Sequence, residues 1–280
     1  MSPLSGWTVA VIGLGTMGSG MAHRLTDQGA TVRAYNRTPG PVVTAATPAD
    51  AARGADLVLV SVADDDALRA VLTGPDGVFA AAPPLVVNAT TVAPATVREL
   101  GGPLVDAGVL GNGQHARDGL LRWYVGGPDS LVRQAQPVLA ALGQQVRHVG
   151  ALGDGMALKL VMNLVMGVEM QVLAEAVALG GAAGLDRQLV LDTITGSGFA
   201  APVMRFKAAR MVGRDYERPD FRLRHMAKDL ALAVAQAGGT DLPMTAASAI
   251  SHAAAVGRGL GEQDCAAIVE QLTGARVGAR

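Results

Sequence analysis

The first half of the chain alternates between short, continuous apolar runs and longer stretches of helical periodicity. Continuous apolar runs are typical of strands buried on both faces, and their alternation with helices predicts a mostly parallel, doubly wound α/β sheet. Predicted strands cover residues 7–12, 31–35, 56–62, 85–88, 104–109, 122–125 and 145–149. Predicted helices cover residues 16–28, a small segment before the third strand, a stretch from about residue 65, and residues 130–142.

The pattern changes after Gly150, where residues 156–183 are apolar almost all round. At 1.5 Å per residue, a single helix of this length would reach about 40 Å. Polar residues interrupt the segment too often for a hydrocarbon core, so no membrane span is predicted. A helix that is apolar on all sides is instead expected to lie buried between domains or subunits. The interrupting residues are Lys159, Asn163, Glu169, Gln171 and Glu175.

Residues 187–272 have helical patterns, with Gly or Pro breaks near residues 196, 219, 238 and 257. The sequence therefore predicts an N-terminal Rossmann domain over 1–150 and an all-α domain over 151–280, joined by the long interdomain helix. We expect the active site to lie in the cleft between these domains. We also expect the long apolar helix to favour a homodimer or a larger homo-oligomer.

Composition removes several classes of function. Half of the 280 residues are hydrophobic and 17% are charged, which excludes an intrinsically disordered chain. A net charge of −1 gives no electrostatic footprint for nucleic acid or an anionic membrane. The single cysteine, Cys265, and five histidines without ligand spacing predict no metal site. No basic segment precedes the first apolar run, so a cytoplasmic protein is expected.

A glycine-rich turn follows the first predicted strand and opens the first predicted helix. In a chain with 36 glycines the motif G-x-G-x-x-G is weak by itself, and a plain turn is the alternative. Its position inside a β-α-β unit is what indicates a dinucleotide site, where backbone and helix N-terminus receive a pyrophosphate. The motif consists of Gly13, Leu14, Gly15, Thr16, Met17 and Gly18.

The end of the second strand predicts which dinucleotide binds. An NAD site normally has Asp or Glu about 20 residues after the glycines, to accept from the ribose 2′-hydroxyl. Here the chain reads Asn36, Arg37, Thr38. The Arg37 guanidinium suits a 2′-phosphate, with Asn36 and Thr38 as neutral donors. NADP(H) is the predicted cofactor, and a solvated surface arginine is the alternative.

Lys159 is one of only three lysines, with Lys207 and Lys228. Asn163 follows it by four residues, so both side chains project from one face of the long helix. The amine either snorkels to solvent or faces a functional cleft. Desolvation lowers the pKa of an amine, which would suit proton transfer beside a hydride acceptor.

Other chemistries lack their residues. The sequence has no G-x-S-x-G nucleophile elbow, no H-E-x-x-H and no G-x-x-x-x-G-K-[ST] phosphate loop. Asp64, Asp65 and Asp66 stand between a strand and a helix, where N-capping is favoured over a metal cluster.

The whole set of motifs resembles one family, the β-hydroxyacid dehydrogenases, which have imine reductases as a sister group. The resemblance covers nearly the whole chain, and the glycine, lysine and asparagine pattern of residues 150–163 is its most specific part. The matching segments are residues 13–18, 36–38, 89–94, 106–112, Gly150-x-x-Gly153-x-Gly155-x-x-x-Lys159-x-x-x-Asn163, and Lys228-Asp229-Leu230 after Phe221.

The resemblance implies a role for each matching residue. Lys159 would be the catalytic acid/base, and Asn163 would orient the lysine or the substrate. Asp229 would lie at the substrate cleft. Contacts to the cofactor are implied for Val62, Ala63, Thr91 and Lys228, the last of which has a plain surface charge as its alternative.

One segment departs from the family pattern Asp-Ala-Pro-Val-Ser-Gly-Gly, whose serine and glycines bind a substrate carboxylate. Here the proline is Gly108, the serine is Leu110, and the two glycines are Gly111 and Asn112. The resemblance therefore implies a Rossmann-type, NADPH-dependent oxidoreductase acting on a small carbonyl or alcohol substrate, with the substrate left open. An imine reductase, against which Lys159 argues, and a catalytically silent NADP-binding module are the alternatives.

Overall fold

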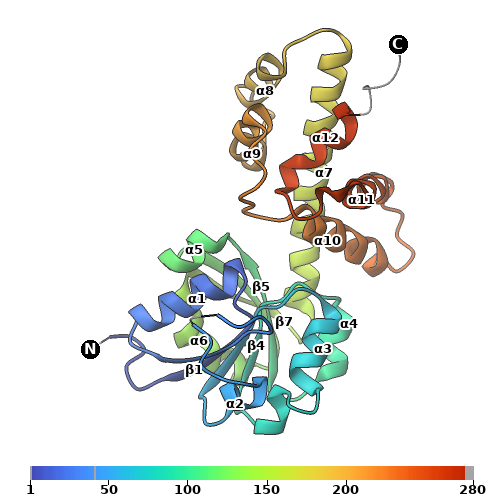
Figure 1. Ribbon diagram of the computed structural model, residues 1–280. Coiled ribbons are helices and arrows are strands. Elements are labelled where there is room, and N and C mark those ends of the chain that lie inside the picture. Colours follow the sequence, from blue (N-terminus) through green and yellow to red (C-terminus); the bar gives the residue numbers. More distant parts are fainter. Residues whose placement is uncertain (1, 41, 275–280) are drawn as a thin grey trace. The chain divides into compact units, whose positions relative to one another are not determined.

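The computed structural model describes residues 2–40 and 42–274 (Figure 1). Its first compact unit reaches Lys159 and its second begins at Leu160. A seven-stranded sheet in the order β2-β1-β3-β4-β5-β6-β7 forms the centre of the first unit, and every neighbouring pair is parallel except β5 with β6. The mostly parallel sheet is thus confirmed. Its strands are β1 (Thr8–Ile12), β2 (Thr31–Tyr35), β3 (Leu57–Val60), β4 (Val86–Asn88), β5 (Leu104–Leu110), β6 (Leu121–Gly126) and β7 (Gly143–Gly150).

Helices cover both faces of this sheet, because the central strands are apolar on both sides. In β1, Val9 and Val11 belong to one buried cluster, and Ala10 and Ile12 belong to another. The first cluster packs against α1 (Thr16–Asp27), α5 (Gly113–Asp118) and α6 (Asp129–Leu142). The second packs against α2 (Pro48–Ala52), α3 (Asp65–Thr73), the short 3₁₀ turn η1 (Val78–Ala81) and α4 (Pro94–Leu100).

The long helix α7 (Asp154–Ala182) begins inside the first unit. A Cβ on Gly155 would lie 2.6 Å from the carbonyl oxygens of Asp106 and Tyr124, so only glycine lets this turn rest on β5 and β6. This packing explains why the first unit extends to Lys159 rather than ending near residue 150. By length and composition alone α7 is also apolar enough to cross a membrane, a test that a core helix passes equally well.

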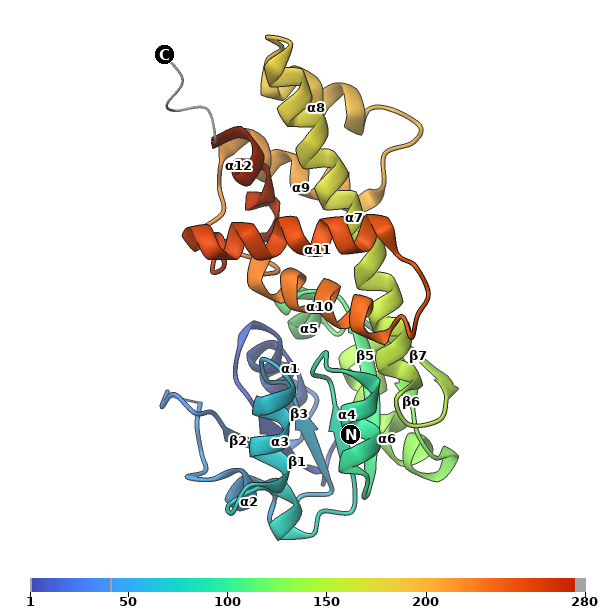
Figure 2. The same ribbon diagram turned by 90° about the vertical axis from the view of Figure 1, so that its right-hand side faces the viewer.

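The second unit is helical over its described part, up to residue 274, and it has its own core. Within it, α10 packs on α7, since a Cβ on Gly167 would meet the side chains of Leu230 and Met226. Figure 2 shows α10 and α11 side by side. The elements are α8 (Arg187–Thr195), α9 (Pro202–Gly213), α10 (Leu223–Gln236), α11 (Pro243–Ala255), η2 (Val256–Leu260), η3 (Cys265–Ala267) and α12 (Ile268–Thr273).

Candidate active site

The glycine-rich turn leads from β1 into α1. Gly13 has φ +93°, and a Cβ on it would collide with the carbonyl of Ser61. A Cβ on Gly18 would collide in turn with the carbonyl of Gly13. Gly15 differs, because no atom lies within 4 Å of where its Cβ would be. Two glycines therefore shape the turn, and the third leaves an open cradle at the N-terminus of α1 that fits the pyrophosphate of a dinucleotide.

Asn36 fastens the end of β2 to this turn. Its Oδ1 accepts from the backbone N–H of Leu14 at 3.0 Å, and its Nδ2 donates to the carbonyl of Thr38 at 2.9 Å. Both ends of the amide thus have partners within the protein. Arg37, whose side chain is exposed, is the charged group at this strand end that could meet a 2′-phosphate.

Two residues that sequence reasoning did not single out join the ends of β3 and β4. Asn88 uses its side-chain amide to hold the backbone of Thr90 through bonds of 2.9 and 3.0 Å. The Thr90 hydroxyl oxygen accepts from the N–H of Val62 at 3.0 Å. This network ties Val62 to Thr90, the residue before Thr91. The available signal was a buried polar pair directly after an apolar strand.

Lys159 lies in the second turn of α7 and is only 9% exposed. A Cβ on Gly108 of β5 would lie 3.0 Å from the Cβ of Lys159 and 2.6 Å from the carbonyl oxygen of Gly155. Alternate residues of a strand share a face, so Leu110 lies on the same face of β5 as Gly108, about 7 Å further along. The first unit thus brings Lys159 close to residues 108–112, the segment that the family resemblance assigns to substrate binding.

The first turn of α7 is held by Asp106, which is fully buried in β5. Its Oδ1 accepts from the N–H of Gly153 at 2.7 Å, and its Oδ2 accepts from the N–H of Met156 at 2.6 Å. Burial raises the pKa of this carboxyl to about 6, against the opposing effect of the two backbone hydrogen bonds. Sequence reasoning did not identify Asp106 as a site residue.

In the second unit, Asp229 joins Asn163 to Lys228. Asn163 donates through Nδ2 to Oδ2 of Asp229 at 2.5 Å, and Lys228 donates through Nζ to Oδ1 at 2.7 Å. Asn163 and Asp229 are each only 1% exposed. Each oxygen of the carboxylate therefore holds one of the polar groups that the sequence had picked out.

His225 lies on α10, three residues before Lys228. Its ring centroid is 6.1 Å from that of Phe221. Burial, reinforced by the positive charge of Arg224, lowers the pKa of His225 to about 4. The shift favours the neutral form of the imidazole.

The segment that departs from the family pattern begins α5. Asn112 is the N-cap, and its Oδ1 accepts from the N–H of His115 at 3.0 Å. The N–H of Asn112 donates to Nδ1 of His115 at 3.2 Å. Gly111 has φ +136°, a conformation that favours glycine. The sequence thus replaces the family's serine and second glycine with an apolar side chain and a helix cap.

Of the aspartates at 64–66, Asp64 serves as a helix cap, as predicted. Oδ1 of Asp64 accepts from the N–H of Ala67 and so begins α3, at 2.9 Å. Asp65 accepts from the N–H of Ala93 at 3.0 Å and from the hydroxyl of Thr96 at 2.5 Å. Within residues 2–40 and 42–274, no three His, Cys, Asp or Glu side chains gather as metal ligands.

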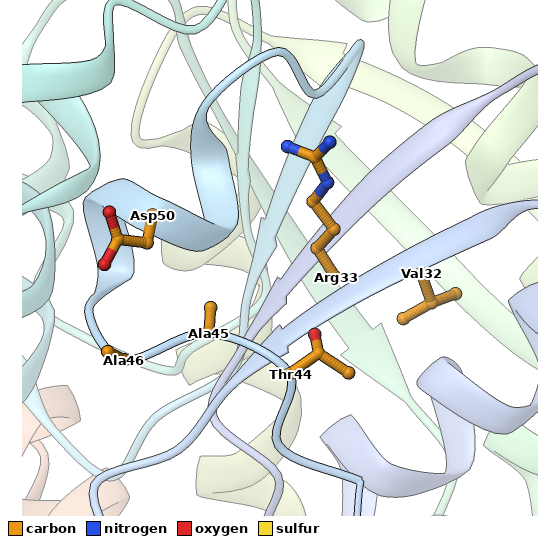
Figure 3. Close-up of a pocket in the computed structure, with 6 residues that line it drawn as sticks. All are labelled: Val32, Arg33, Thr44, Ala45, Ala46 and Asp50. Carbon is orange, nitrogen blue, oxygen red and sulfur yellow. The ribbon is translucent and has the colours of Figure 1, made fainter.

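A pocket of about 470 Å³ opens elsewhere, at the outer edge of β2 (Figure 3). None of its residues is a predicted site residue. The guanidinium of Arg33 donates to the carbonyl of Arg53, so its charge already has a partner. The pocket therefore has no evident link to the chemistry of Lys159. It is lined by Val32, Arg33, Thr44, Ala45, Ala46 and Asp50.

Comparison with known proteins identifies both halves of the chain. Residues 8–150 match the NAD-binding domain of 6-phosphogluconate dehydrogenase, and residues 153–272 match the NAD-binding domain of NADP-dependent 3-hydroxyisobutyrate dehydrogenase. The 2-(hydroxymethyl)glutarate dehydrogenase of Eubacterium barkeri is 32% identical, over 96% of this chain and 97% of its own length.

Solved structures agree with this assignment. The 3-hydroxyisobutyrate dehydrogenase of Salmonella typhimurium superposes with a TM-score of 0.85 at 25% identity, covering 94% of this chain and 99% of its own. An imine reductase of Streptomyces aurantiacus superposes with a TM-score of 0.59 at 25% identity, covering 94% and 98%. The motifs, the sheet and the two matched domains place the chain in the β-hydroxyacid dehydrogenase family of NAD(P)-dependent oxidoreductases.

Proposed function

We propose that the protein is an NADPH-dependent oxidoreductase that interconverts a carbonyl compound and the corresponding alcohol. The observation that carries this proposal is the place of Lys159, which is nearly buried on α7 and packs on β5 beside the substrate segment. An amine held there, in the unit that contains the dinucleotide cradle, is suited to general acid/base catalysis.

The choice of NADP over NAD rests on the end of β2. Arg37 is exposed there, and the neighbouring Asn36 and Thr38 carry no negative charge. A guanidinium binds a phosphate through paired, charge-assisted hydrogen bonds, whereas an NAD site uses a carboxylate to receive the 2′-hydroxyl. Gly13, Gly15 and Gly18 would hold the pyrophosphate, with Val62, Ala63, Thr91 and Lys228 as further contacts.

Each residue of the proposed site has a separate role in the reaction. When bound, NADPH supplies the hydride that reaches the carbonyl carbon. In reduction, Lys159 donates a proton to the oxygen of the developing alkoxide, and in oxidation it removes that proton. Asn163 is held at a fixed orientation by Asp229, which limits the positions it can take toward substrate. Leu110 supplies an apolar wall in place of a hydrogen-bond donor.

Reduction of a C=N bond is the second candidate, and the match to an imine reductase favours it. The retained lysine argues for the carbonyl reaction, since the family resemblance associates Lys159 with that chemistry. Purified protein with NADPH decides between the two when glyoxylate, succinic semialdehyde, butanal, benzaldehyde and 2-methyl-1-pyrroline are compared as substrates. We expect the highest kcat/KM with an uncharged aldehyde, and loss of that turnover in Lys159→Ala.

The same assay tests the alternative that the protein is a catalytically silent NADP-binding module. Such a module would bind NADPH, measured by quenching of protein fluorescence, yet would oxidise it with none of the five compounds. Faster turnover of the cyclic imine than of every aldehyde would replace the carbonyl reaction by imine reduction.

We also propose that the protein forms a homodimer through α7. Val161, Val165, Val172 and Leu179 are exposed on this helix, the last of them at 74%. At about 100° per residue they fall within roughly 40° of one another around the helix axis, so they form one apolar stripe. A stripe of this kind is expected to be covered by a second copy of the chain. Light scattering at micromolar concentration tests this, and Leu179→Glu is expected to give monomers.

A further inference from the structure

The buried carboxylate of Asp106 acts as a cap for a helix that begins far away in sequence. Its donors, the N–H groups of Gly153 and Met156, belong to the loop before α7 and to its first turn. These N–H groups have no partners inside the helix, because the first turn lacks preceding carbonyls. A negatively charged acceptor at a helix N-terminus also interacts favourably with the positive end of the helix dipole.

Close backbone packing supports the same turn. A Cβ on Gly126 would lie 2.5 Å from the carbonyl oxygen of Ala151 and 2.6 Å from Oδ1 of Asp106. Together with Gly108 and Gly155, this glycine lets α7 approach β5 and β6 too closely for any side chain to intervene. The turn cannot shift toward the sheet, and the carboxylate prevents it from moving away.

Lys159 is three residues beyond Met156, so it lies above that residue on the same side of the helix. Its Cβ contacts the position of Gly108, two residues from Asp106 along β5. Any rotation or lift of the first turn would therefore displace the lysine amine relative to the strand that carries the substrate segment.

We propose that Asp106 is the positioning residue for Lys159: by capping α7 on β5 it fixes where the lysine amine delivers its proton. This inference rests on the proposed function, since it assumes that Lys159 carries the acid/base role. In this proposal Asp106 acts only through the helix, because both of its carboxylate oxygens already accept from backbone N–H groups.

The charged groups around Asp106 fit a cap rather than a second acid. Asp154 lies on the same turn of α7 and is paired with Arg98 of α4 at 3.4 Å. Arg98 also donates to the carbonyl of Leu152 at 3.0 Å, which holds the loop before the helix. The neighbouring elements also carry Arg122 and Tyr124 on β6, Glu99 on α4, and Lys159, Glu169 and Glu175 on α7. Both oxygens of Asp106 already accept from the backbone, so no oxygen lacks a partner.

The first test is hydrogen exchange, which needs no substrate. Asp106→Asn replaces one acceptor oxygen by an NH₂ group, so either Gly153 or Met156 loses its partner. We expect faster exchange in residues 151–160, with unchanged exchange in β1 and β3. Asp56→Asn is the matched control, because Asp56 also accepts from a backbone N–H, that of Thr8 at 2.8 Å, at the start of β1. Unchanged exchange in residues 151–160 of Asp106→Asn would overturn the cap.

The second test asks whether Asp106 acts through Lys159, using NADPH and benzaldehyde as the probe. We expect Asp106→Asn to lower kcat by roughly 10-fold or more, as a small misplacement of a catalytic group does, with KM for NADPH unchanged. Gly108→Ala, which moves no charge but inserts a Cβ beneath Lys159, should act alike, and Asp56→Asn should leave kcat unchanged. In a Lys159→Ala background, Asp106→Asn should have less than about a twofold further effect, since coupled sites are not additive.

The outcomes separate the two proposals. Equal fractional losses from Asp106→Asn with and without Lys159 would show that Asp106 does not act through the lysine. A lower melting temperature with unchanged kcat would show that the cap is structural only. Wild-type kcat in Lys159→Ala would instead refute the acid/base role of the lysine, while the exchange experiment would still decide whether Asp106 caps α7.

Discussion

Asp229 accepts from Nδ2 of Asn163 at 2.5 Å, and this hydrogen bond ties α10 to α7 within the second unit. The partner on its other oxygen is the ammonium of Lys228. A single buried carboxylate thus orients two residues that the family resemblance assigns to substrate and cofactor. This arrangement makes Asp229 an anchor for both.

Asp229→Asn tests that anchor. The amide keeps one acceptor oxygen but turns an NH₂ group toward either Asn163 or Lys228, so one buried bond is lost. We expect the free energy of unfolding to fall by about 1–3 kcal/mol, the cost of an unsatisfied buried polar group. KM for NADPH should rise as Lys228 loses its orientation. Urea denaturation and steady-state kinetics measure the two effects, and unchanged values of both would contradict the anchor.

Lys159 is tested by two substitutions that differ in charge. Lys159→Ala is expected to lower turnover by roughly 10²-fold or more, the typical contribution of a positioned proton donor. NADPH affinity should remain nearly intact. Lys159→Arg should fail almost as badly, because a guanidinium does not release its proton. An arginine variant that keeps most of the activity would mean that the lysine acts as a fixed cation.

Cofactor choice gives a prediction for Arg37. The unmodified protein should prefer NADPH over NADH by about 10-fold or more in kcat/KM, equivalent to at least about 1.4 kcal/mol. Arg37→Asp should shrink or invert this ratio, since a carboxylate repels a 2′-phosphate and accepts from a 2′-hydroxyl. Thr38→Ala, which removes a predicted neutral donor without changing the charge, separates the contribution of the Thr38 hydroxyl from that of the Arg37 charge. Equal kcat/KM for both cofactors would contradict the NADP assignment.

The raised pKa of Asp106 predicts how the free energy of unfolding depends on pH. Its folded-state pKa of about 6 lies above the ordinary value of 3.8. Between those values the folded protein binds the proton more tightly than the unfolded chain, so this group's contribution to stability falls as pH rises through 6. From pH 5 to pH 7 the contribution should drop by about 1 kcal/mol. Asp106→Asn should remove this component, which urea denaturation at both pH values would detect as a smaller difference than in the wild type.

The sequence predicted the elements whose pattern is local and continuous. The strands around Val9, Val58 and Val87 have continuous apolar runs, and the glycine turn at residues 13–18 lies where it was expected. The short helix α5 was missed, because its six residues carry no apolar period and its start depends on the cap formed by Asn112 and His115. The helix α4 was likewise not predicted, although Pro94 at its first position is a helix-start signal.

The supporting residues of the site could not be read in the same way. Asp106 stands in an apolar strand, and its nearest capping donor is 47 residues later in the chain. Asn163 pairs with a carboxylate 66 residues away. Periodicity and motif spacing describe neighbours along the chain, whereas these bonds exist only after β5, α7 and α10 have packed. The glycine at position 108, where the family pattern has proline, shows the same point. It is needed because the carbonyl oxygen of Gly155 leaves no room for a Cβ there.

Leu110 determines the last prediction, which concerns the substrate. Its side chain stands where the family pattern has a serine. It lies on the same face of β5 as Gly108, the face against which Lys159 packs. The adjacent N–H of Asn112 already donates to Nδ1 of His115, so it is not free to replace the serine as a donor. A substrate carboxylate left without a partner costs about 1–3 kcal/mol or more. We therefore expect weak turnover of 3-hydroxyisobutyrate, tartronate semialdehyde and glyoxylate, and faster turnover of larger or less charged carbonyl compounds.

Leu110→Ser should raise kcat/KM for glyoxylate relative to benzaldehyde, because the hydroxyl restores a donor. Leu110→Ala is the matched control, since it enlarges the site equally without adding a donor. A rise in both variants would assign the effect to space rather than to hydrogen bonding. Turnover of 3-hydroxyisobutyrate by the unmodified protein near 10⁵ M⁻¹s⁻¹, an order of magnitude typical of an enzyme with its own substrate, would refute the argument. In that case the side-chain NH₂ of Asn112, which is not used in capping α5, would be the first donor to remove, by Asn112→Asp.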